Sequence, residues 1–210
     1  MTDIHNQNKR TLKTLREALY NYEPATVRKV INTLFSADAL VQLAYPFETL
    51  NGPEALYEQA YQGLQHAIPD LERRDTIVMA GPTGHGDNWV GCCGYYTGSF
   101  EKPWLDIPPT GHQVAMRYHE FFRFEDDRIV EMQALWDIPE LMLQAGAWPM
   151  SPSLGREWQV PAPAPQNGIV QAPWDADHAA ASQQLVGDMC DGLGRYAQGG
   201  AEAMQLERYW

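Results

Sequence analysis

The most constraining feature of the sequence is a pair of alternating segments near its middle, at residues 113–124 and 128–136. Successive side chains of a β-strand point to opposite faces, so a period of two separates an apolar face from a polar one. The short charged run Glu125-Asp126-Asp127 lies between the segments and suits a tight turn. The sequence therefore predicts two paired strands whose apolar face lines the core or a pocket.

Helical periodicity dominates the first part of the chain. Apolar residues recur at steps of three and four from residue 8 to 34, and Pro24, after a break, suits the first turn of a second helix. A short strand and turn follow, and Gly52-Pro53-Glu54 opens a third helix that ends before residue 68. Strands are expected near residues 71–80 and 89–100, and a short helix at 138–145. Helices followed by a mostly antiparallel meander indicate an α+β fold.

The last third of the chain has a different composition. Residues 150–175 are rich in proline and glycine, which is typical of a linker or an extended tail. Residues 176–210 return to a helical pattern, with Leu185, Met189, Leu193 and Tyr196 on one side. We expect one domain at residues 1–149, a Pro-rich linker or tail at 150–175, and a helical segment at 176–210.

Charge and motif content exclude several functional classes. The net charge of −12 and a pI of about 4.8 disfavour binding to nucleic acid. Cys92, Cys93 and Cys190 lack the C-x-x-C spacing, and the six histidines lack a ligand spacing, so we expect no disulfide framework and no metal. The sequence has neither a nucleotide-binding motif, nor a signal peptide, nor a bilayer-length apolar run. These observations predict a cytoplasmic protein without cofactor or membrane partner.

Several short motifs occur in a specific order. They are N-G-P-E at residues 51–54, I-P-D-L at 68–71, I-P-P-T-G at 107–111, F-R-F-E-D-D-R-I-V-E at 122–131 and D-x-x-x-L-x-x-Q-x-G at 137–146. In this order the chain resembles the SnoaL-like polyketide cyclases of the nuclear-transport-factor-2-like (NTF2-like) superfold over about residues 8–150. The resemblance implies an NTF2-like cone, in which a curved, mostly antiparallel sheet and three N-terminal helices enclose a deep apolar pocket.

The resemblance also bears on the C-terminal segment. Residues 176–210 look like the opening of a second such domain, with a helix, a glycine-containing break and a final L-E-R-Y-W. A second repeat that is truncated is one interpretation, and a C-terminal helix that docks on a partner subunit is the other.

Glu120 is the main candidate for a catalytic residue. On the strand 113–124 it shares the apolar face with Met116, Tyr118 and Phe122, whereas His119 lies on the mixed face, where a solvated or ion-paired histidine is expected. A buried carboxylate is unfavourable unless it is paired, and burial can tune it for acid or base chemistry. The alternative is that an arginine or tyrosine elsewhere satisfies Glu120.

The resemblance fails at the residues that carry out the chemistry. In the cyclases the aspartate that acts as general acid or base corresponds to Ala134 here, and its partner histidine corresponds to Glu120. Asp137 matches an aspartate of the family pattern and is a second catalytic candidate, but its place before Ile138-Pro139 equally suits a helix N-cap.

Aromatic and polar side chains are expected to line the pocket. The candidates are Tyr45, Trp89, Tyr95, Trp104, Tyr118, Phe122 and Trp136, with Tyr96 and Asn51 in addition. Such a set suits a small apolar, oxygenated molecule, although it equally suits an ordinary core. Two functions stay open. One is cofactor-independent acid/base cyclisation or isomerisation of a carbonyl-containing apolar substrate; the other is a non-catalytic module that binds a ligand or forms a homodimer.

Overall fold

Two helices open the chain, at the positions that the apolar spacing predicts. The computed structural model describes residues 3–152 and 159–209. Helix α1 (Ile4–Tyr20) begins at Asp3, whose side chain accepts a hydrogen bond from the Asn6 backbone N–H, and α2 (Pro24–Leu34) has its proline in the first turn. The third predicted helix is continuous from residue 52 to 67, as α3 (Gly52–Leu56), a π-helical turn (Tyr57–Tyr61) and α4 (Gln62–Ala67).

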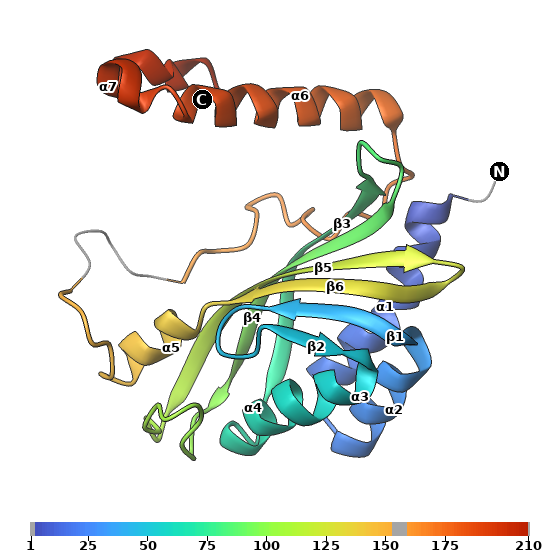
Figure 1. Cartoon of the computed structure of the whole chain (residues 1–210), viewed down its shortest axis with the longest axis vertical. Helices are drawn as coiled ribbons and strands as arrows, with labels where there is room; N and C mark the ends of the chain where they lie inside the picture. Colours follow the sequence, from blue (N-terminus) through green and yellow to red (C-terminus); the bar gives the residue numbers. More distant parts are fainter. Residues whose placement is uncertain (1–2, 153–158, 210) are drawn as a thin grey trace. The chain divides into compact units, whose positions relative to one another are not determined.

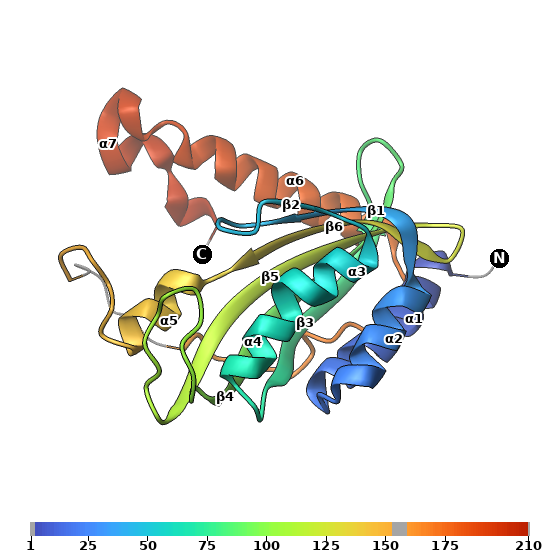
Figure 2. The same cartoon turned by 60° about the horizontal axis from the view of Figure 1, so that its bottom comes forward.

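A six-stranded sheet forms the second layer, with the strand order β2-β1-β6-β5-β4-β3. The strands are β1 (Phe35–Leu43), β2 (Thr49–Asn51), β3 (Glu72–Pro82), β4 (Asn88–Ser99), β5 (Gln113–Glu125) and β6 (Arg128–Trp136). Neighbouring strands pair antiparallel except β1 and β6, which pair parallel. Figure 2 shows the helices α1 to α4 along the concave side of this curved sheet. The predicted α+β, NTF2-like cone is confirmed.

The hairpin of β5 and β6 has the turn that the sequence indicates. Asp126 and Asp127 both have a positive φ, as the tightest hairpin turns require, and aspartate tolerates that backbone. Along β5 the even-numbered residues are buried and the odd-numbered ones are more exposed. The core therefore lies between the even face of β5 and the helices, and Glu120 stands on that inner face.

A short helix and an extended segment complete the first unit, residues 1–172. Helix α5 (Ile138–Gln144) follows β6 directly. Residues 168–170 lie beside the outer edge of β3, where Val78 donates a backbone hydrogen bond to Gly168 and accepts one from Val170 (2.9 and 3.0 Å). This part of the Pro-rich segment is therefore held against the sheet (Figure 1).

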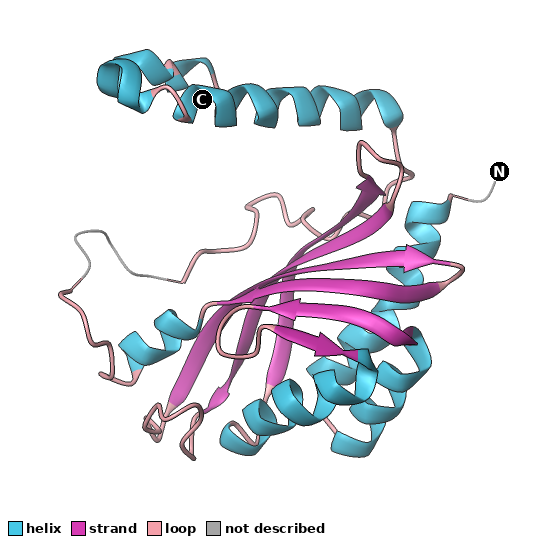
Figure 3. Ribbon diagram, viewed as in Figure 1, coloured by secondary structure: helices cyan, strands magenta, loops and turns pink. Residues whose placement is uncertain are grey.

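The second unit, residues 173–210, is helical, as its spacing predicts. It contains α6 (Ala176–Leu193), capped by Asp175, then α7 (Tyr196–Met204) and a 3₁₀ turn (Leu206–Arg208); Figure 3 shows these elements as helix. Its larger apolar side chains, such as Leu185 and Tyr196, are exposed. In the described part of the chain, no helix combines the length and apolarity that a membrane crossing requires.

Candidate functional site

The inner face of the sheet carries a buried ion pair between Glu120 on β5 and Arg73 on β3. Both side chains have 0% exposed surface, and Arg73 Nη1 donates a hydrogen bond to Glu120 Oε2. Glu120 Oε1 accepts two further hydrogen bonds, from Tyr96 Oη and Trp136 Nε1, each at 2.9 Å. Three donors thus satisfy the carboxylate, as a buried charge requires.

Arg73 reaches Glu120 across the intervening strand β4. In the strand register Arg73 lies opposite Tyr96, and Cys92 lies opposite Glu120. The guanidinium lies over the ring of Tyr118, 4.2 Å from its centroid, and donates to Tyr96 Oη at 3.0 Å. Burial alone would lower the pKa of Arg73, but the facing carboxylate of Glu120 raises it well above its usual value.

Asp75 extends this pair toward the surface. Its Oδ1 accepts hydrogen bonds from Tyr118 Oη (2.7 Å) and Arg73 Nε (3.1 Å), and its Oδ2 accepts one from Arg16 Nε on α1 (2.9 Å). Arg16, Asp75, Arg73 and Glu120 therefore form a row of alternating charges from the helix layer into the core. The row is built from three separate elements, α1, β3 and β5.

Gly94 makes the contact between Tyr118 and Asp75 possible. It lies between these two residues in the strand register, and a Cβ placed there would stand 2.7 Å from Tyr118 Oη and 2.0 Å from the backbone oxygen of Arg74. Only a residue without a side chain lets the tyrosine lie across β4 and reach the aspartate.

The tyrosines beside the ion pair act as hydrogen-bond donors. Burial, with a contribution from the charge of Glu120, raises the pKa of Tyr61 and Tyr96 well above the usual value, and burial likewise raises the pKa of Tyr118. These phenols stay protonated over the physiological range. The hydroxyls of Tyr61 and Tyr96 lie 3.2 Å apart, which links α3–α4 to the sheet.

Aromatic rings fill the space in front of Glu120. The ring of Trp136 has its centroid 5.4 Å from those of Tyr61 and Tyr96, 5.8 Å from that of Phe47 and 6.5 Å from that of Trp104. Ala134, opposite Glu120 in the register, is also buried. Glu120 has no exposed surface, so the surrounding side chains close it off from the solvent.

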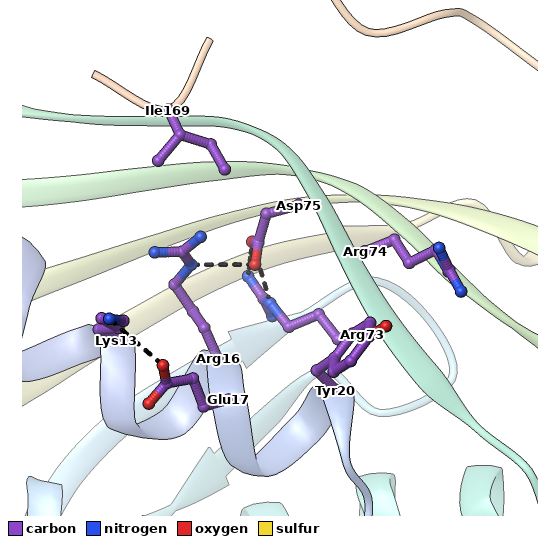
Figure 4. Close-up of a pocket in the computed structure, with 8 residues that line it drawn as sticks. All are labelled: Lys13, Arg16, Glu17, Tyr20, Arg73, Arg74, Asp75 and Ile169. Carbon is purple, nitrogen blue, oxygen red and sulfur yellow. Dashed lines mark hydrogen bonds and ion pairs between the residues drawn. The ribbon is translucent and has the colours of Figure 1, made fainter. Parts of the chain in front are cut away.

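A cleft of about 350 Å³ lies between α1 and β3, at the outer end of the charge row. Its walls come from Lys13, Arg16, Glu17 and Tyr20 on α1, from Arg73, Arg74 and Asp75 on β3, and from Ile169. Figure 4 shows Arg16 and Asp75 pointing toward each other across it, with Ile169 above them. Asp75, with 7% of its side chain exposed, is thus the acidic member of the row that reaches the surface.

The structure brings together some of the predicted site residues and separates others. Tyr118, Phe122 and Trp136 are buried with Glu120 on the inner face, and Trp104 packs on Trp136. Tyr45 is 81% exposed in the loop between β1 and β2. Trp89 and Tyr95 alternate with the inward-facing Val90 and Tyr96, so they lie on the outer face of the sheet.

Asp137 lies at the start of α5 and caps it. Its side chain accepts a hydrogen bond from the Glu140 backbone N–H at 3.1 Å. Glu140 in turn accepts one from the Arg117 backbone N–H at 2.9 Å, and burial raises the pKa of this glutamate. Asp137 belongs to this capping arrangement and shares no hydrogen bond with Glu120 that the structure describes.

Sequence reasoning missed Arg73, Asp75 and Arg16. Arg73 and Asp75 are two apart in a predicted strand, so their shared face could be read from the sequence. The order of the strands, which sets β3 beside β4 and β5 beyond it, was not available from spacing. Among the described residues, no group of three or more His, Cys, Asp or Glu side chains is placed to hold a metal ion.

Comparisons with known proteins agree with this fold. IdmH from Streptomyces antibioticus, a proposed polyketide cyclase, has a TM-score of 0.55 at 20% identity over 67% of this chain and 99% of its own. A proposed SnoaL-like polyketide cyclase from Jannaschia sp. CCS1 gives 0.57 at 23% over 70% and 96%. AclR from Streptomyces galilaeus, a proposed hydroxylase, gives 0.57 at 19% over 70% and 90%.

The sequence comparisons define the family. No curated protein matches the chain significantly. The sequence profile of the SnoaL-like polyketide cyclases matches residues 10–145, which is more than half of the chain and includes all six strands and Glu120. The chain therefore belongs to the SnoaL-like polyketide cyclase family.

Proposed function

We propose that this protein binds a small apolar, oxygenated molecule and that Glu120 holds its inner wall together instead of carrying protons. The carrying observation is the enclosure of Glu120, which has three hydrogen-bond donors and no exposed surface. A general base needs an oxygen within hydrogen-bond reach of its substrate. Arg73, Tyr96 and Trp136 occupy the positions around the Glu120 carboxylate that a substrate would need.

The aromatic rings in front of Glu120 support the binding of an apolar ligand. Phe47 and Trp104 stand on loops, after β1 and after β4, and pack on Trp136. Loops move more readily than the strands that they connect. A displacement of these two rings opens the apolar inner wall, where stacking and burial stabilise a flat organic molecule.

The acid/base hypothesis makes a different demand on the same residues. For Glu120 to take a proton from a substrate, at least one of its three donors, Arg73, Tyr96 or Trp136, must move away from the carboxylate. If Arg73 moves, the buried ion pair is broken at a cost of about 3–5 kcal/mol, and if Tyr96 or Trp136 moves, the cost is that of a buried hydrogen bond to a charge, about 1.5–3 kcal/mol; the bound ligand must supply it. Binding of a ligand to the aromatic wall without proton transfer leaves all the contacts of Glu120 intact.

The two hypotheses separate in a proton-exchange experiment. The probe is 2-tetralone in D₂O, whose protons next to the carbonyl exchange when a base abstracts them, followed by proton NMR. We expect saturation transfer from the protein to the ring protons and an exchange rate equal to that in buffer. Faster exchange that Glu120→Gln abolishes in a folded protein would instead establish Glu120 as the proton carrier.

A homodimer through the outer face of the sheet is a second candidate function. Phe121 and Leu135 are exposed on β5 and β6 (46% and 63%), and Leu40 is exposed farther along the same face of the sheet, opposite Glu131. Exposed apolar side chains gathered on one face are typical of an interface. Sedimentation velocity of Leu135→Glu tests this: we expect a dimer that this variant dissociates and that the control Met150→Glu leaves intact.

A further inference from the structure

The cleft between α1 and β3 is lined by more cationic than acidic side chains. Four cationic residues line it, namely Lys13, Arg16, Arg73 and Arg74, against the two acidic residues Glu17 and Asp75. The chain carries a net charge of −12. Arg73 is paired with Glu120 and Arg74 with Glu72, so Arg16 and Lys13 are the cations that can face an anion in the cleft.

Arg16 presents free donors to this cleft in a fixed orientation. Its Nε is bound to Asp75 Oδ2 at 2.9 Å, and only 15% of its side chain is exposed. The terminal nitrogens Nη1 and Nη2 have no hydrogen-bond partner among the described residues, and in Figure 4 they point away from Asp75. These two nitrogens form a fork that fits the two oxygens of a carboxylate or phosphate.

Arg73 lies at the floor of the cleft. Its side chain is completely buried, and its Nη2 lacks a hydrogen bond within the described chain, although it lies 3.1 Å from Asp75 Oδ1. A buried N–H without an acceptor is unfavourable by an amount comparable to a lost hydrogen bond. Because Arg73 has no exposed surface, it supports the floor of the cleft and positions Asp75, and direct contact with an anion falls to Arg16.

The remaining lining residues indicate the chemistry of the ligand. Lys13 pairs with Glu17 at 3.3 Å, but both side chains are more than 60% exposed, so the pair is weak and the ammonium is available. Tyr20 and Ile169 supply apolar surface, and Arg74 lies over the ring of Tyr20. We propose that the cleft binds a small organic anion, with its carboxylate or phosphate head on Arg16 and its apolar body against Tyr20 and Ile169.

The proposal is independent of ligand binding at the inner wall of the sheet. It is tested on the full chain by isothermal titration calorimetry with benzoate, phenyl phosphate, inorganic phosphate and the neutral benzamide. Benzoate and phenyl phosphate are expected to bind, inorganic phosphate more weakly because it lacks an apolar body, and benzamide not at all. The stronger of the two organic anions identifies the head group, and increasing salt weakens both. Equal binding of benzamide and benzoate overturns the proposal.

Variants locate the anion. Arg16→Gln is expected to weaken the binding of the stronger organic anion about tenfold or more, since a hydrogen bond to a charged group contributes at least that much. The control is Arg10→Gln on the same helix, an exposed arginine outside the cleft, which leaves affinity unchanged. If Arg16→Gln does not fold, Ile169→Glu decides, because it leaves every cation in place and adds a repelling charge to the wall. Unchanged affinity in the folded variant contradicts the site.

Discussion

Glu120 and Asp75 are two carboxylates that hold the same arginine, but they lie in different surroundings. Glu120 is sealed in the core with Arg73, Tyr96 and Trp136, whereas Asp75 joins Arg73 to Arg16 at the edge of a cleft. Glu120 is closed off from any ligand. Asp75, in contrast, orients Arg16, whose terminal nitrogens face the cleft. Depth in the fold, more than residue type, separates a structural charge from one that supports binding.

The largest expected effect comes from removing the shared arginine. Arg73→Met leaves Glu120 buried without its cation, so the free energy of unfolding falls by about 3–5 kcal/mol. Urea denaturation measures the change. The matched control is Arg74→Met, one residue along the same strand but 57% exposed, which changes stability by no more than about 0.5 kcal/mol. Similar losses for the two variants would mean that the buried pair is not special.

A double variant is the next test, because it removes both charges of the sealed pair. Glu120→Gln keeps the shape and the acceptor for Tyr96 and Trp136. Combined with Arg73→Met, it is expected to cost about 2 kcal/mol less than the sum of the two single variants, as coupled neighbours do. The same cycle with Asp75→Asn should show that Asp75 also couples to Arg73. Simple additivity for Glu120 would place its stabilisation in the tyrosine and tryptophan hydrogen bonds.

Alkaline pH should weaken the sealed region. Burial raises the pKa of Cys92 to about 12 and also raises the pKa of Tyr61, Tyr96 and Tyr118. In the unfolded chain these groups lose protons at lower pH, at about pH 8.5 for cysteine and about pH 10 for tyrosine. Their contribution is therefore complete below about pH 8, and each group's share declines by about 1.4 kcal/mol per pH unit once the pH exceeds its unfolded pKa. Urea unfolding between pH 7 and 11 measures this, and Tyr96→Phe should make the decline shallower. A flat curve would contradict it.

The smallest effect is expected at Asp137, which lies outside both regions. Asp137→Ala removes the N-cap of α5 and should lower the free energy of unfolding by about 1 kcal/mol, whereas Asp137→Asn, which also caps, should cost less. Thermal unfolding measures both. If the protein accelerates proton exchange in the tetralone experiment and Asp137→Asn removes that acceleration without a loss of stability, Asp137 acts in chemistry.

Much of the fold could be predicted because its signals are local. The alternation along β5, the aspartates of the hairpin turn and the proline that opens α2 act within a few residues of one another, and each predicted element is present. Asp137 is similar: an aspartate before Ile138-Pro139 predicts a cap from sequence alone.

The candidate site depends on contacts that spacing does not reveal. Arg73 and Glu120 stand on strands that are separated by β4, so their contact follows from the strand order. Gly94 on β4 leaves the room that Tyr118 needs beside them. Tyr95 looked like a pocket residue because β4 carries aromatic residues on both faces. The Pro-rich segment covers the outer face of β4 at this point, where Val160 donates a backbone hydrogen bond to the Tyr95 hydroxyl at 2.7 Å. The sequence alone does not indicate that the Pro-rich segment packs on the outer face of the sheet.

The segment at residues 168–170 also protects the sheet from other molecules. β3 is an edge strand, and an edge with free N–H and C=O groups is a template for strands of another chain. Gly168 and Val170 occupy both groups of Val78, at the middle of this edge. The approach is so close that a Cβ on Gly168 would lie 2.2 Å from the backbone oxygen of Thr76. Loss of this glycine would lift the segment from the strand and expose the protein to edge-to-edge aggregation.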